Sequence, residues 1–194
     1  MDSTNKIVSS ESEELILVDA DDNEIGHMTK AACHDGVGRL HRAFSVFLFN
    51  DAGELLLQRR SGSKRLWPGY WSNSCCSHPR RNETMDVATP RRLRDELNVE
   101  AELEFIYRFT YRAEFGELGS ENESCHVYLG RIDGAVRPNE QEISAHRFVS
   151  AAVLNDEFES RPDQFTPWFK MEWRALEFEY QDALKRYCDL QREA

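Results

Sequence analysis

A thiol and an imidazole stand close together in residues 71–79, which read Trp-Ser-Asn-Ser-Cys-Cys-Ser-His-Pro. Cys76 precedes His78 by two residues, and Trp71 opens the segment. A cysteine can exchange a proton, a histidine can bind a borderline divalent metal, and a tryptophan can line an apolar pocket. We therefore expect acid–base and metal chemistry to share one small pocket at this segment.

Four further residues offer metal ligands at suggestive spacings. His34 and His41 are seven residues apart, and the two glycines between them favour a loop that folds back. Glu121 and Glu123 are separated by one residue, so on an extended segment both side chains leave the same face. Together with His78 they would suit a borderline divalent ion with up to six ligands. Each residue alone is more often a solvated or hydrogen-bonded side chain, so the hypothesis depends on all five converging.

A second group of residues is basic, although the formal net charge of the chain is −11. Basic residues gathered around one pocket would favour a ligand that carries phosphate. The alternative is a solvated sheet edge, which is the commoner role of each such residue alone. The group comprises Lys30, Arg59, Arg60, Lys64, Arg65, Arg91 and Arg92.

Composition narrows the class of protein. A chain of 194 residues with 40% hydrophobic and 30% charged residues is typical of a soluble domain with a substantial core. The negative charge argues against a general nucleic-acid binder. We expect no membrane span, because no apolar run approaches the roughly 18–20 residues that one needs, and no signal peptide. Five cysteines, two of them adjacent, make a poor disulfide framework and favour a reducing cytoplasm.

Hydrophobic patterning predicts a polar, disordered leader over residues 1–13 and one α/β domain over residues 14–194. Hairpins are expected at 15–28 and 44–57, strands at 105–115, 125–132 and 147–149, and helices at 83–97, 153–158 and 166–187. Thr166 and Pro167 supply a cap and a first helical residue for the last helix. Pro90 lies inside helix 83–97, where the missing donor costs about 3 kcal/mol unless the helix starts late or kinks.

Taken together, these motifs resemble the type I isopentenyl diphosphate isomerases, a family of enzymes with the Nudix fold. The resemblance covers about residues 15–176 and keeps the order and spacing of the family's motifs. It implies an α/β (α+β) fold, in which helices flank a Nudix-like mixed sheet that carries an extra N-terminal hairpin and a C-terminal helix. The matching segments are residues 39–45, 58–61 with Lys64, 67–71, 72–79, 91–97, 111–113, 121–123 and 166–168.

The resemblance also implies an activity and a role for each motif residue. The family interconverts isopentenyl and dimethylallyl diphosphate by protonation and deprotonation through a tertiary carbocation. The catalytic residues would be Cys76, Glu123 and Tyr111. A Zn2+, Mn2+ or Mg2+ ion would be held by His34, His41, His78, Glu121 and Glu123. Glu96 would bind a Mg2+ ion that bridges to the diphosphate. Substrate contacts would come from Lys30, Arg60, Lys64, Arg92 and Trp168.

This chemistry explains why such residues occur together. The Trp168 ring can stabilise a desolvated cation by about 2 kcal/mol. Dry walls from Trp71 and Trp168 would keep water away from the carbocation. Cys76 and the Glu123–Tyr111 pair are the candidates for the two acid–base groups, and the sequence leaves open which of them donates first.

The chain departs from the family patterns at five positions. Cys75 stands where the isomerases usually carry a small or apolar residue. Arg92 replaces a carboxylate that Nudix pyrophosphohydrolases use to hold metal, which counts against hydrolysis. Ser77 and Asn98 replace glycines and are expected in tight turns. Pro90 is expected to disturb the helix that carries Arg92 and Glu96.

Two rival functions remain open. A Nudix pyrophosphohydrolase would cleave a nucleoside diphosphate derivative and would have no need of Cys76. A non-catalytic metal-binding or regulatory module would bind metal without turnover. Cys76 and Trp168 at family-like positions favour the isomerase, acting on a small diphosphate as a monomer or weak dimer.

Overall fold

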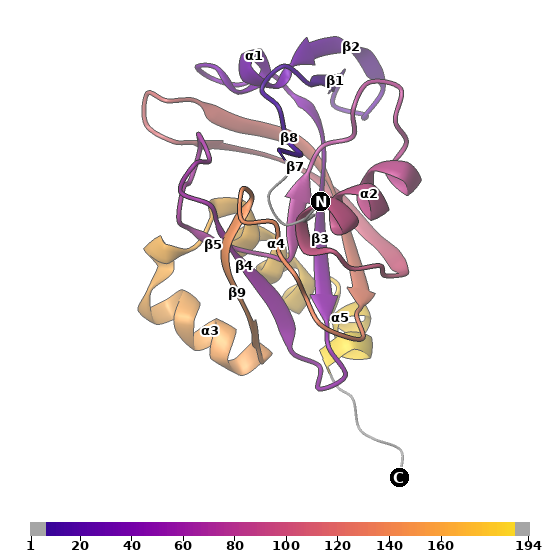
Figure 1. The fold of residues 1–194 in the computed structure, drawn as a ribbon, viewed down its shortest axis with the longest axis vertical. Coiled ribbons are helices and arrows are strands. Elements are labelled where there is room, and N and C mark those ends of the chain that lie inside the picture. Colours follow the sequence, from indigo (N-terminus) through magenta and orange to yellow (C-terminus); the bar gives the residue numbers. More distant parts are fainter. Residues whose placement is uncertain (1–6, 189–194) are drawn as a thin grey trace.

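A mixed β-sheet runs through the fold, and helices cover both of its faces (Figure 1). The computed structural model describes residues 7–188. The strands are β1 (Glu14–Val18), β2 (Glu24–Thr29), β3 (His41–Phe49), β4 (Leu55–Arg60), β5 (Trp71–Ser72), β6 (Cys75–Ser77), β7 (Leu103–Glu114), β8 (Ser120–Arg131) and β9 (Ile143–Val149). The helices are α1 (Lys30–His34), α2 (Met85–Leu97), α3 (Ala151–Ser160), α4 (Pro167–Phe178) and α5 (Gln181–Cys188), with a 3-10 turn at Pro162–Gln164.

Strand β3 is the centre of the sheet and organises the rest. It pairs antiparallel with β1, β4 and β6, and parallel with β8 over the whole length from His41 to Phe49. All but one of its residues are buried, as expected for a strand that is covered on both faces. The parallel register sets His41 beside Glu123, and the β6 register sets Ser45 beside Cys76.

The two faces of the sheet carry separate hydrophobic cores. On one face of the sheet, Phe47 of β3 packs with Phe169 and Trp173 of α4. On the other face, Phe44 of β3 shares a hydrophobic cluster with Leu93 of α2. Alternate residues of a strand point to opposite faces, so β3 feeds both cores. The predicted mixed sheet with flanking helices is confirmed, and β1 and β2 form the predicted N-terminal hairpin.

Helix α2 forms despite Pro90 and begins at Met85, two residues later than expected. The helix keeps a buried face that includes Leu93 and Leu97, and this packing outweighs the missing donor. Asn98 ends the helix in the left-handed conformation, with φ of 54°. This conformation is expected at a position where the family pattern has a glycine. The matching expectation for Ser77 is wrong, because Ser77 is the last residue of strand β6.

The last helix differs from the prediction. Residues 166–187 form two helices, because the backbone N–H groups of Glu179 and Tyr180 both donate to the Ala175 carbonyl and end α4. The Tyr180 ring then stacks on Tyr107 of β7, with ring centroids 4.4 Å apart. Among residues 7–188, no helix has the length and apolar character to cross a bilayer.

Residues 7–13 belong to the predicted leader but make defined contacts instead of lying loose. The Arg92 guanidinium donates to the Val8 carbonyl over 2.7 Å, and the Lys30 backbone N–H donates to the Glu13 carbonyl over 2.8 Å. Val8 is buried. Hydrogen bonds from the domain to backbone carbonyls, which a sequence pattern does not reveal, hold this segment. Residues 1–6 of the predicted leader lie outside the described residues.

Candidate active site

A cavity of about 350 Å³ opens between the leader, the sheet and α4. Its lining combines the three groups of side chains that the sequence singled out: the candidate acid–base and aromatic residues, most of the candidate metal ligands, and the basic residues. Cys76, Tyr111 and Trp168 line it together with acidic, imidazole and basic groups. Trp67 packs edge-to-face behind Trp168, with ring centroids 5.1 Å apart. Apolar walls and ionised groups therefore meet in one cavity.

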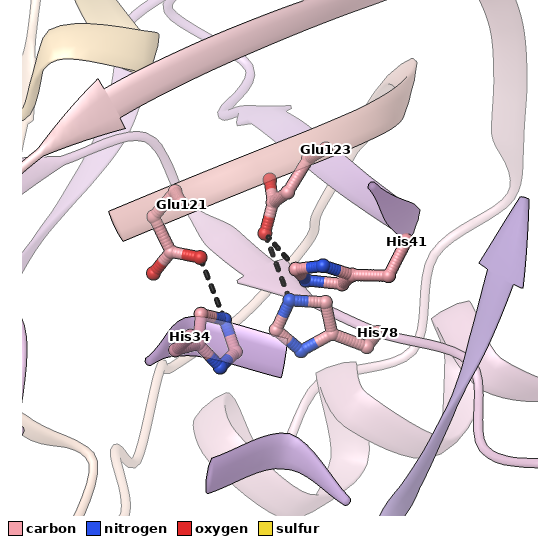
Figure 2. Close-up of side chains that lie close together, drawn as sticks. All are labelled: His34, His41, His78, Glu121 and Glu123. Atoms are coloured by element: carbon pink, nitrogen blue, oxygen red, sulfur yellow. Dashed lines mark hydrogen bonds and ion pairs between the residues drawn. The ribbon is translucent and has the colours of Figure 1, made fainter. Parts of the chain in front are cut away.

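Three imidazoles and two carboxylates converge beside this cavity (Figure 2). One ligand atom from each of the five residues lies within 4.8 Å of those from all the others. His34 ends α1, His41 begins β3, and His78 follows β6. Glu121 and Glu123 leave the same face of β8, as their spacing predicts, and all five side chains point toward one another in Figure 2.

The hydrogen bonds of this cluster fit a divalent metal. The Nδ1 atoms of His34 and His41 each lie 2.7 Å from a backbone carbonyl, of Lys30 and Arg39 respectively. An N–H at Nδ1 leaves the Nε2 lone pair free to face the cluster. The buried Nε2 atoms of His34 and His41 lie 2.7 Å from Glu121 Oε2 and 3.7 Å from Glu123 Oε1 (Figure 2), and within residues 7–188 neither Nε2 atom meets the geometry of a hydrogen bond. Buried polar atoms that share one focus are suited to a common cation.

The charge states of the cluster also suit metal binding. Burial acts to raise the pKa of Glu121 and of Glu123, but the neighbouring histidines outweigh it and hold both pKa values below the usual range. Burial, with the adjacent His41 and His34, lowers the pKa of His78 well below its usual value. Ionised carboxylates and a neutral imidazole are the forms that bind metal. Burial acts to lower the pKa of His34 as well, but the Glu121 carboxylate outweighs it and raises that pKa, so a positive charge is favoured at this position.

Cys76 is half-buried, and several polar groups surround its sulfur. The thiol donates to Asn73 Oδ1 over 2.7 Å, and the indole N–H of Trp168 donates to the sulfur over 3.3 Å. The hydroxyls of Ser45 and Ser72 each lie 3.7 Å from it. Burial raises the pKa of Cys76 to about 12, so the resting group is a thiol that can donate a proton.

Tyr111 and Glu123 form a buried phenol–carboxylate pair. They lie directly opposite each other in the β7–β8 register, and the Tyr111 hydroxyl donates to Glu123 Oε2 over 2.6 Å. Burial raises the pKa of Tyr111 well above its usual value, and the Glu123 carboxylate adds to this effect. The phenol therefore keeps its proton next to an ionised carboxylate. Both residues line the same cavity as Cys76.

The basic side chains around the cavity are held by backbone carbonyls and acidic partners. Arg60 donates from Nε to the Trp67 carbonyl over 3.1 Å and lies 5.4 Å from the centroid of the Trp168 ring. Arg92 is buried and forms an ion pair with Glu96. The basic residues that line the cavity are Lys30, Arg60, Lys64, Arg65 and Arg92.

Comparisons with known proteins identify the family. A model of the NUDIX domain matches residues 39–169. Isopentenyl-diphosphate Delta-isomerase 1 of Photorhabdus laumondii is 40% identical over 166 residues, which cover 84% of this chain and 94% of that protein. Isopentenyl-diphosphate Delta-isomerase of Serratia proteamaculans is 45% identical over 158 residues, or 81% of this chain and 87% of that protein. The chain belongs to the isopentenyl-diphosphate Delta-isomerase family.

Solved structures agree with the Nudix fold of this isomerase family. A crystal structure from Deinococcus radiodurans matches with a TM-score of 0.66 at 24% identity, covering 91% of this chain and all of that one. A MutT protein from Methanosarcina mazei matches with a TM-score of 0.60 at 17% identity, covering 73% and 96%. At such low identities these likenesses carry the fold alone.

The structure brings together nearly all the residues that the isomerase resemblance singled out. Two of them do not line the cavity. His41 joins it through the histidine–glutamate cluster, whereas Glu96 is buried behind Arg92. The expected wall from Trp71 is wrong, because Arg147 stacks over that ring at 4.5 Å and Leu66 lines the cavity instead.

Three residues that sequence reasoning missed complete the surroundings of the site. Glu142 is buried in the cavity wall, where it pairs with Lys64 and lies 3.6 Å from Arg92. Ser45 and Glu172 lie behind the Cys76 sulfur. The sequence offered one signal for Ser45 and Glu172, namely a polar residue within an apolar strand or within a helix. A residue of this kind is usually solvated, so the signal alone does not predict a role in a site.

Proposed function

We propose that this protein interconverts isopentenyl diphosphate and dimethylallyl diphosphate by adding a proton to one carbon and removing one from a neighbour. The observation that carries this proposal is that the Cys76 thiol and the Glu123–Tyr111 pair line one cavity, which also contains the Trp168 ring. Shifting an unactivated double bond requires two acid–base groups that reach the same small substrate. Family membership supports the same reaction.

Different residues of the cavity would transfer protons, stabilise the carbocation and exclude water. A proton delivered to the double bond creates a tertiary carbocation, which the face of Trp168 would stabilise by about 2 kcal/mol. The two candidates for proton transfer are Cys76, a thiol at rest, and Tyr111 with Glu123. Burial of the walls would keep water from capturing the carbocation.

We propose that the histidine–glutamate cluster holds a divalent ion, which can be Zn2+, Mn2+ or Mg2+. Its charge would tune the acidity of Glu123 and of the phenol bonded to it. The buried Nε2 atoms of His34 and His41, which face the carboxylates of Glu121 and Glu123, support this assignment. The proposed ligands are His34, His41, His78, Glu121 and Glu123.

We propose that the basic side chains Lys30, Arg60, Lys64 and Arg92 bind the diphosphate. Remote binding of this kind would position the reacting carbons between the acid–base groups. The two hydrogen bonds that Arg92 makes to Glu96 both end on Oε1, which leaves Oε2 as the proposed ligand for a Mg2+ ion that bridges to the diphosphate.

An assay with two substrates separates the isomerase from a Nudix pyrophosphohydrolase. The protein should convert isopentenyl diphosphate to dimethylallyl diphosphate and release no phosphate from nucleoside diphosphate derivatives. Arg92 stands where hydrolases carry a metal-binding carboxylate, and its ion pair with Glu96 supports this expectation. Phosphate release without double-bond transposition would overturn the proposal.

Replacing Glu96 with glutamine should chiefly weaken diphosphate binding. Loss of a carboxylate ligand for Mg2+ should raise KM for isopentenyl diphosphate and shift the Mg2+ dependence to higher concentrations, with a smaller change in kcat. Steady-state kinetics over a Mg2+ titration measure both effects. Glu100→Gln, at a carboxylate whose side chain is 83% exposed, is the matched control. Unchanged KM and Mg2+ dependence in Glu96→Gln would remove this residue from the diphosphate site.

Removing the metal of the histidine–glutamate cluster should stop turnover. We expect His41→Ala to reduce both the metal content of the purified protein and its activity, because His41 supplies a buried ligand. His27→Ala should change neither, since His27 pairs with Glu24 outside the cluster. Elemental analysis and rate measurements test the pair. A His41→Ala protein with full metal content and activity would contradict the ligand assignment.

We propose that the protein acts in the cytoplasm as a monomer or weak dimer, with residues 14–194 as one domain. Free thiols at Cys33, Cys75, Cys76 and Cys125, within the part of the chain that the structure describes, support a reducing compartment.

A further inference from the structure

Glu172 is a buried acidic residue that the proposed reaction does not yet use. It lies on α4, four residues after Trp168, and its exposed fraction is 0%. The thiol of Cys125 donates to its Oε1 over 3.5 Å, whereas Oε2 has no hydrogen-bond partner among residues 7–188. Its neighbours on α4, Phe169 and Trp173, both belong to one hydrophobic core cluster. An ionised carboxylate in such surroundings would be strongly disfavoured.

Ser45 connects Glu172 to the catalytic thiol. It lies opposite Cys76 in the β3–β6 register, with its hydroxyl oxygen 3.7 Å from the Cys76 sulfur. The same hydroxyl lies 3.5 Å from the Cys125 sulfur, whose thiol also donates to Glu172 Oε1, and it acts to lower the pKa of the Glu172 carboxyl group. Ser45 is thus a bridge from the core side of α4 to the sulfur that faces the cavity.

The protonation state of Glu172 decides where the single hydroxyl proton of Ser45 points. Beside an ionised carboxylate, the Ser45 O–H would donate to Glu172 and would be lost to Cys76. Beside a neutral carboxylic acid, the acid O–H can donate to Ser45 Oγ, and the Ser45 O–H is directed to the Cys76 sulfur. Burial raises the pKa of Glu172 to about 8, so the neutral form prevails at pH 7.

We propose that Glu172 is a positioning residue for isomerisation: as a neutral acid it directs the Ser45 hydroxyl proton onto the Cys76 sulfur. This role rests on the proposed function. When the S–H bond of Cys76 breaks and the proton forms a C–H bond on the substrate, the electron pair stays on sulfur. Ser45 and the indole N–H of Trp168 then donate to that sulfur, and the return of a proton reverses the step.

Glu172→Met separates this role from simple packing. Methionine has a similar size and removes a buried polar group, so the fold should be kept and its thermal midpoint should not fall. We expect kcat to fall by about 10- to 100-fold with KM unchanged, as for the loss of one hydrogen bond to a charged group. Glu172→Gln should keep kcat within a few-fold, because its amide N–H can still donate to Ser45.

Two variants of neighbouring residues test the path. Ser45→Ala should lose as much kcat as Glu172→Met, and the double variant should lose no more than either single one. Cys125→Ala should stay within about two-fold of the unaltered protein, because Cys125 contacts both Ser45 and Glu172 but not the reacting sulfur. Full kcat in Ser45→Ala or in Glu172→Met, or additive losses in the double variant, would overturn the proposal. An unaltered protein without isomerase activity would instead overturn the proposed function.

The pH profile gives a readout that a purely structural role would not move. The kcat of the unaltered protein should fall as pH rises through about 8, where Glu172 ionises, and Glu172→Gln should lack this fall. Burial raises the pKa values of Cys76, Cys125 and Tyr107, which face Glu172, and Glu123 is held ionised, so these groups titrate elsewhere. The same alkaline fall in Glu172→Gln would contradict the assignment.

Discussion

Replacing Cys76 with alanine should abolish isomerisation and leave the fold intact. The thiol lines the cavity with Tyr111 and Glu123, and loss of a general acid–base group lowers rates by about 10²- to 10⁴-fold. A methyl group in place of a half-buried thiol removes little packing, so thermal unfolding should change only slightly. Product formation from isopentenyl diphosphate and a thermal melt measure the two effects.

The adjacent Cys75 is a natural control for this prediction. It points to the opposite face of β6, where it is fully buried in the core that contains Leu93 of α2. Burial raises its pKa well above the usual thiol value, which makes it an inert core residue. Cys75→Ala should keep kcat near that of the unaltered protein. The reverse ranking of the two variants would move the acid–base role to Cys75.

Replacing Glu123 with glutamine should also abolish turnover, again by about 10²- to 10⁴-fold. The amide cannot take up the proton that passes through Tyr111, and it is a weaker metal ligand than a carboxylate. Measurement of kcat at saturating substrate and metal isolates the proton-transfer role. Glu121→Gln removes a ligand without a bond to Tyr111, so excess divalent ion should restore part of its activity. Wild-type rates in Glu123→Gln would exclude its acid–base role.

The sequence revealed the site more completely than the structure that surrounds it. The alternation of Glu121 and Glu123 correctly placed both carboxylates on one face of a strand. Their pairing with His41 depends on a parallel register between segments 82 residues apart, which local patterns do not encode. The family resemblance supplied that long-range information.

The parts that sequence patterns missed share one cause: tertiary contacts override local preference. Pro90 predicted a disturbed helix, yet the buried face of α2 holds the helix together. The polar leader looked disordered, yet Arg92 binds its Val8 carbonyl. No sequence pattern singled out Glu142 or Glu172, yet both are buried around the cavity and its thiol.

Isomerisation of isopentenyl diphosphate in deuterated water tests the central claim most directly. If Cys76 and the Glu123–Tyr111 pair exchange protons with the substrate from one cavity, solvent deuterium must enter the new methyl group of dimethylallyl diphosphate. Mass spectrometry of the product should detect this label, and neither Cys76→Ala nor Glu123→Gln should produce labelled product at a comparable rate. Dimethylallyl diphosphate that forms at full rate without deuterium would show a direct hydrogen shift within the substrate and would contradict the account.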